Sequence, residues 1–153
     1  GTIDVALTND RSKNQNFKTD ILVTRASEMA IIQKGIFEKY AQIVELNDLK
    51  ANACILICKI AEQEAEYDYY RNVLNISNQL IAVDSVNEAV LMAESGSGFF
   101  LMNESNAHLI KSESLQKLFL FNNHSQVKED YVLLSKNESQ DITEFSELLK
   151  AEF

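Results

Sequence analysis

Residues 84–102 have the sequence DSVNEAVLMAESGSGFFLM, which predicts a helix, a glycine turn and a buried strand in succession. Ser85 and Glu88 have the spacing of a capping box, in which each side chain satisfies a free backbone N–H of the first helical turn. Apolar residues recur three or four positions apart, as on one buried helix face: Val86, Ala89, Val90 and Ala93. Gly96 can adopt the positive φ that ends a helix, and Gly98 allows a close backbone approach. Such a unit places a helix N-terminus and a glycine turn in one α/β layer, where small ligands commonly bind.

Strand-like apolar runs alternate with helix-like runs along the rest of the chain. The expected strands span residues 3–7, 21–25, 29–33, 54–57, 81–83, 99–102, 115–121 and 131–135, with a bend at 26–28. Further helices are expected at residues 61–74, 104–110 and 142–153. Strands that alternate with helices predict an α/β fold with a mostly parallel sheet covered by helices.

Several motifs together resemble the effector-binding domain of LysR-type transcriptional regulators. Residues 83–99 fit the family pattern V-x-S-x-x-x-A-x-x-x-x-x-x-G-x-G-hydrophobic. Residues 1–7, GTIDVAL, look like the family's G-x-L-D-[LV]-A-[IL] strand. Residues 45–49, ELNDL, are similar to its L-x-D-L turn before a strand, and residues 142–153 fit its C-terminal helix. The resemblance covers the whole chain in the right order.

The resemblance implies a periplasmic-binding-protein-like domain of two α/β lobes joined by two crossover strands. Residues 27–114 would form the second lobe, and residues 1–26 and 115–153 would form part of the first lobe. The family's opening βαβ segment and its N-terminal winged helix-turn-helix are not represented in this sequence, so we expect an N-terminally truncated first lobe. Asn103 stands where the family often has a proline after the strand that follows the glycine turn.

Effector contacts in the family come from loops at the carboxyl ends of strands that line the cleft. Carried over by position, the effector-binding residues implied here are Thr8, Lys59, Ile60, Ala61 and Ser85.

Each of these positions also has a structural interpretation. Helix capping alone accounts for Ser85, Thr8 fits an ordinary loop residue, and Lys59 fits an exposed lysine that pairs with no ligand. Asp84 beside Ser85 would repel a carboxylate, so an anionic effector does not follow from Lys59.

The function that the resemblance implies is effector sensing: a small molecule bound between the lobes controls DNA binding by a helix-turn-helix domain outside this sequence. A net charge of −9 and a pI near 4.7 argue against DNA contacts through this segment itself. The resemblance also implies a homodimer or higher oligomer. The helix at 61–74, which carries three tyrosines, fits either a dimer contact or packing on its own sheet. The alternative function is a solute-binding protein of the same fold.

The remaining chemistry-bearing residues do not indicate an enzyme or a cofactor. Cys54 and Cys58 fit small buried apolar groups, and neither histidine has zinc-motif spacing to them. His108 and His124 fit surface histidines, and the Gly96 turn lacks the glycine spacing of a nucleotide-binding loop. Free cysteines and the lack of a long apolar run favour a cytoplasmic protein without a membrane span.

Overall fold

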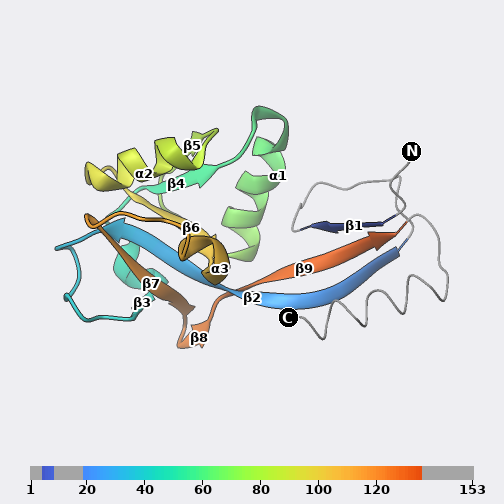
Figure 1. Ribbon diagram of the computed structural model, residues 1–153, viewed down its shortest axis with the longest axis horizontal. Helices are drawn as coiled ribbons and strands as arrows, with labels where there is room; N and C mark the ends of the chain where they lie inside the picture. The colour runs from blue at the N-terminus through green and yellow to red at the C-terminus, as the bar shows by residue number, and fades with distance from the viewer. Residues whose placement is uncertain (1–4, 9–18, 136–153) are drawn as a thin grey trace. The chain divides into compact units, whose positions relative to one another are not determined.

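The computed structural model describes residues 5–8 and 19–135, with side chains described for residues 26–128 (Figure 1). The chain divides into two compact units, Ser27–Val127 and a second unit made of Gly1–Ala26 and Lys128–Phe153. The division after Val127 differs from the boundary at 114/115 that the resemblance implies. Residues 115–127 belong with the larger unit because β7 (Leu115–Asn122) pairs with strands β2 and β3 of that unit.

A mixed sheet forms the centre of the larger unit. Three strands run parallel in the order β5 (Leu80–Val83), β4 (Cys54–Ile57) and β6 (Phe99–Asn103). Strand β2 (Thr19–Gln33) is antiparallel to both β6 and β7, and β3 (Ile43–Glu45) is parallel to β7. A short β8 (Ser125–Gln126) forms a hairpin with β7. The expected parallel direction holds for β3, β4, β5, β6 and β7, whereas β2 and β8 run against them, so the sheet is mixed.

Helices cover both faces of this sheet. The helices α2 (Val86–Glu94) and α3 (Glu104–Ala107) enclose one apolar core with alternate residues of β2, β4 and β6. The opposite core includes residues of the 3-10 helix η1 (Leu46–Leu49) and of the π-helical turn η3 (Tyr69–Val73). The 3-10 helix η2 (Ile60–Glu62) and α1 (Gln63–Asp68) lead into η3, so the expected helix at 61–74 is built from three contiguous pieces. Tyr70 is buried in this second core, and Tyr67 and Tyr69 pack against it.

Strand β2 is continuous where the sequence predicted a bend at residues 26–28. Its pairing explains the difference, since Glu28 stands opposite Asn103 on β6 and Met29 stands opposite both Met102 and Phe119. The Glu28 N–H also donates a 3.0 Å hydrogen bond to the Val127 carbonyl. Neighbouring strands on both sides thus hold these residues extended, and local composition did not reveal those neighbours.

The glycine turn after α2 is the one that the sequence predicted. Gly96 has φ +81°, and its N–H donates to the Ala93 carbonyl at 3.0 Å. The Ser97 N–H donates to the Met92 carbonyl at 2.9 Å. These two bonds form a Schellman motif, which satisfies carbonyls that the end of the helix leaves free.

The smaller unit contains a strand pair within its described residues. Strand β1 (Val5–Thr8) is antiparallel to β9 (Lys128–Ser135), with Val5 opposite Ser135 and Thr8 opposite Val132. The strand expected at 131–135 lies within β9, and the described residues 5–7 of the strand expected at 3–7 lie in β1. The helix expected at 142–153 lies outside the described residues.

Candidate functional site

The carboxyl ends of the parallel strands β4, β5 and β6 meet at one edge of the larger unit. Ile57 stands opposite Val83 at the ends of β4 and β5, and the Cys58 N–H donates to the Val83 carbonyl at 2.9 Å. The chain then leaves β4 through Lys59 and leaves β5 through Ser85. Because both strands end at this edge, it collects the predicted site residues Lys59, Ile60, Ala61 and Ser85.

Thr8 is the remaining predicted site residue. It belongs to the smaller unit, whereas the other four residues belong to the larger unit. It is the last residue of β1, in the smaller unit, where it pairs with Val132. Its participation in a site with the other four residues stays a prediction.

Ser85 is the N-cap of α2, as its spacing to Glu88 predicted. Its backbone is extended, and its hydroxyl accepts a 3.2 Å hydrogen bond from the Glu88 N–H. The Glu88 carboxylate in turn accepts a 3.4 Å bond from the Asp84 N–H, one residue before the cap itself. The Ser85 oxygen therefore has a structural role, and its hydroxyl proton remains available to a ligand because the cap uses the oxygen only as an acceptor.

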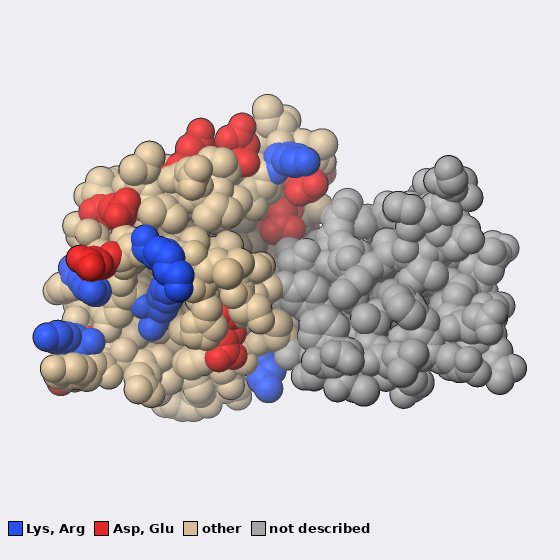
Figure 2. Space-filling model, viewed as in Figure 1, with Lys and Arg blue, Asp and Glu red and all other residues tan. Residues whose placement is uncertain are grey.

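The segment from Lys59 to Ala61 is exposed and opens the helical segment after β4. Ile60 is 89% exposed, which is unusual for a large apolar side chain. The following turns carry several acids: Glu62, Glu64, Glu66 and Asp68. Basic and acidic side chains are likewise interspersed on the face of the described part shown in Figure 2. A ligand at this edge would therefore meet charges of both signs beside an apolar side chain.

Asn103 is a polar residue at this edge that the sequence reasoning did not place in the site. It ends β6, is 8% exposed, and accepts a 2.8 Å hydrogen bond from the Asn106 N–H as the N-cap of α3. Glu28 stands opposite it on β2 and is also buried. The sequence does carry a signal for this capping role, because Asn103 stands between an apolar strand and a short helix and asparagine is a preferred N-cap residue.

The two cysteines are buried thiols. Burial raises the pKa of Cys54 to about 12, against a smaller opposing effect of the Arg71 charge. Burial also raises the pKa of Cys58, and the Glu66 and Glu62 carboxylates raise it further. Both groups are free cysteines held as neutral thiols, in agreement with the sequence interpretation.

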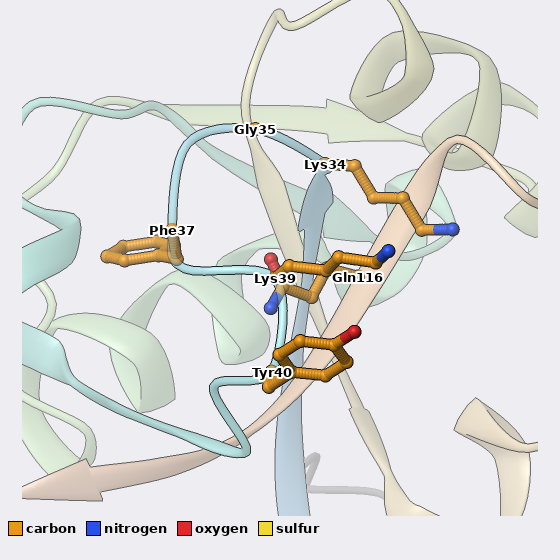
Figure 3. A pocket seen from close by; sticks show the side chains of 6 residues that line it. All are labelled: Lys34, Gly35, Phe37, Lys39, Tyr40 and Gln116. Atoms are coloured by element: carbon orange, nitrogen blue, oxygen red, sulfur yellow. The ribbon is translucent and has the colours of Figure 1, made fainter.

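A cavity of about 510 Å³ lies away from these residues, at the loop between β2 and β3 (Figure 3). Strand β2 runs antiparallel to β6, so this loop leaves the sheet at the edge opposite to Lys59 and Ser85. Nothing in the sequence had indicated it.

Among the described residues, no cluster of three or more histidine, cysteine or acidic side chains is arranged to hold a metal ion. The helices of the described part are too short or too polar to span a bilayer.

Solved structures of LysR-family transcriptional regulators match the chain, whereas comparison with protein-family models and with curated proteins finds no match. CbnR, a LysR family transcriptional regulator, matches with a TM-score of 0.69 and 12% identity over 97% of this chain and 52% of that chain. OxyR from Corynebacterium glutamicum, a cysteine mutant bound to hydrogen peroxide, matches with a TM-score of 0.71 and 18% identity over 97% of this chain and 48% of that chain. The effector-binding domain of a BenM variant matches with a TM-score of 0.66 and 16% identity over 98% of this chain and 72% of that chain.

These matches define the fold. The chain has the two-lobe α/β fold of LysR effector-binding domains, which confirms the resemblance seen in the sequence at the level of fold. The chain spans about half the length of the full-length regulators that it matches.

Proposed function

We propose that the chain is the effector-sensing domain of a LysR-type transcriptional regulator. The observation that carries the proposal is the meeting of Lys59, Ile60, Ala61 and Ser85 at the carboxyl edge of β4 and β5, within this fold. In open α/β sheets, ligands bind in the crevice outside the carboxyl ends of the strands. The small molecule would bind at this edge, and Thr8 stays a contact predicted from the family resemblance.

The regulated output would be DNA binding by a winged helix-turn-helix domain outside this sequence. Effector binding would favour one geometry of the lobes or of the dimer over another. The difference between the effector's affinities for the two geometries would set the size of the response. One matching structure is full-length CbnR complexed with its target DNA. The net charge of −9 fits a sensing module that leaves DNA contacts to another domain, and a homodimer or higher oligomer would carry paired DNA-binding domains.

The chemistry of the edge favours a polar effector that is neutral or zwitterionic. Lys59 offers a cation, but Asp84 and Glu62 lie on the segments that leave the same two strands. A multiply charged anion would meet those carboxylates, whereas a molecule with balanced charge can pair with both signs. Thiol oxidation is a poor fit as the signal, because reactive cysteines need an accessible thiolate and both cysteines here are buried. Free thiols fit a cytoplasmic location.

The first test is to read the gene sequence upstream of the Gly1 codon. An in-frame winged helix-turn-helix supports the proposal, and a secretory signal peptide in its place supports the alternative, a solute-binding protein of the same fold. An enzyme on this scaffold is less well supported, because the solved structures that the chain matches include transcriptional regulators.

The second test is a thermal-shift screen of the chain against neutral and zwitterionic metabolites. A hit that binds at the proposed edge should lose affinity in Lys59→Ala and retain it in Lys50→Ala. Lys50 is the exposed C-cap residue of η1 and precedes the amino end of β4. Equal affinities in the two variants would place the ligand elsewhere.

A further inference from the structure

The cavity at the β2–β3 loop has the size and the mixed lining of a small-molecule site. Its volume is about 510 Å³, within the range of roughly 300–1,000 Å³ that is usual for ligand pockets. It is lined by Lys34, Gly35, Phe37, Lys39, Tyr40 and Gln116. All but Gln116 come from one loop, and Gln116 comes from β7, where it stands opposite Ile32 of β2 (Figure 3).

Gln116 is the residue that points to a ligand. It is 8% exposed, and its Nε2 donates to the Glu38 carbonyl at 2.8 Å and, more weakly, to the Ala41 carbonyl at 3.4 Å. Two carbonyl acceptors fix the carboxamide, because a flipped group would turn its oxygen toward them. Its Oε1 is then buried with no hydrogen-bond partner among the described residues. A buried acceptor without a donor is costly, and a ligand that supplies the donor recovers that free energy.

The loop supplies the other two features that a ligand would use. Tyr40 is 79% exposed and offers its ring at the cavity, whereas the Phe37 ring packs against the core and points away from Tyr40 (Figure 3). Lys34 and Lys39 are exposed cations at the same cavity, and the Lys39 ammonium lies 5.4 Å from the centre of the Tyr40 ring. The two ammonium groups can pair with an anion, and the Tyr40 ring offers a face on which a planar group can stack.

We propose that this cavity binds a small aromatic carboxylate that carries a hydroxyl or amino donor on its ring. The ring packs against Tyr40, the carboxylate pairs with Lys34 or Lys39, and the ring donor satisfies Gln116 Oε1. Because water does not reach Oε1, the loop moves slightly when the donor enters. The space beside Gly35 is open, since a Cβ built there would have no atom within 4 Å, so no packed neighbour opposes a shift of the backbone at that position. The proposal is independent of the effector site, which lies at the opposite edge of the sheet.

The test uses three matched probes and the unaltered chain, followed by amide chemical shifts in NMR titrations. The probe 4-hydroxybenzoate has the ring, the charge and the donor; benzoate lacks the donor, and phenol lacks the charge. We expect 4-hydroxybenzoate to bind about tenfold more tightly than either of the others, because one hydrogen bond or ion pair is worth about that factor. The shifts should concentrate at residues 34–40 and at Gln116.

Two variants test the cations without touching the buried amide. The double variant Lys34→Ala/Lys39→Ala should weaken 4-hydroxybenzoate binding about fivefold, whereas Lys50→Ala should leave it unchanged. Equal affinities for the three probes, or shifts that concentrate at residues 59–61 and 85, would overturn the proposal. Loop shifts that grow with protein concentration in the absence of a probe would also overturn it, because a second copy of the chain would then be the occupant of the cavity.

Discussion

Gly98 lies so close to the backbone of Ala53 that a Cβ at Gly98 would be 2.5 Å from the Ala53 carbonyl oxygen. The same oxygen accepts a 3.0 Å hydrogen bond from the Phe99 N–H. Phe99 begins β6 opposite Cys54, the first residue of β4. The glycine therefore allows β6 to start its pairing with β4, the strand that leads to the proposed effector site.

Gly98→Ala should destabilise the fold by about 3 kcal/mol, the upper part of the usual cost of overpacking, because a backbone oxygen cannot move aside. Chemical denaturation with urea measures the loss. Gly35→Ala is the matched control, since its Cβ would have no atom within 4 Å and only the φ of +97° opposes it. That control should lose about 1 kcal/mol. Equal losses in the two variants would contradict the steric explanation.

Ser85→Ala should cost about 1 kcal/mol of unfolding free energy, the usual value for a lost N-cap. The variant removes the hydroxyl that accepts the Glu88 N–H at 3.2 Å. Ser85→Thr keeps a hydroxyl at the same position and should lose less. Urea melts of Ser85→Ala that coincide with those of the parent would remove the capping role, and the residue would then be left to ligand binding alone.

The parts of the fold that could be predicted are those that short-range patterns determine. Three features illustrate this: the strand at 54–57, the N-cap at Ser85 and the turn at Gly96. Each is determined by residues that lie close to it in the sequence. The candidate site residues Lys59 and Ser85 came from the family resemblance and not from a local pattern, and the fold places both after the carboxyl ends of neighbouring parallel strands.

Long-range pairing set the features that the sequence did not reveal. β2 stays extended at Glu28 because β6 and Val127 pair with it, and neither partner is a neighbour in sequence. Gln116 looks like an ordinary polar residue of an alternating strand. Only the fold places it against the Glu38 carbonyl, 78 residues away, and so buries its amide. Polar residues on strands carry no local signal of burial, so the second cavity was not predictable.

Asn78→Asp should destabilise the larger unit by about 3 kcal/mol at neutral pH, because it leaves two carbonyls without donors and faces them with a carboxylate. Asn78 is 7% exposed, and its Nδ2 donates to the Leu49 carbonyl at 2.8 Å and to the Asn52 carbonyl at 2.6 Å. The exposed residue Asn47 provides the control, and Asn47→Asp should change stability by less than about 0.5 kcal/mol. Urea melts of the two variants make the comparison, and similar stabilities would show that the Asn78 bonds contribute little.

The two thiols should be protected from alkylation in the folded protein and released on unfolding. Cys54 is 0% exposed with a pKa raised to about 12, and Cys58 is 8% exposed with a pKa raised by burial and by the Glu66 and Glu62 charges. Iodoacetamide followed by mass spectrometry should label Cys54 only in urea, and Cys58 slowly in the native state. Cys54→Ala and Cys58→Ala would assign each labelling rate to its thiol.

The same pKa shifts predict how thiol ionisation affects stability at alkaline pH. The folded thiols hold their protons at pH values where unfolded cysteines, with a pKa of about 8.5, ionise. The unfolded state then binds fewer protons, so the stability that the buried thiols contribute is complete below that pKa and is lost as the pH rises toward the folded value of about 12 for Cys54. Urea melts across this range measure the loss, and Cys54→Ala should flatten it. Rapid oxidation of either native thiol by hydrogen peroxide at neutral pH would contradict this account and would reopen thiol oxidation as the signal.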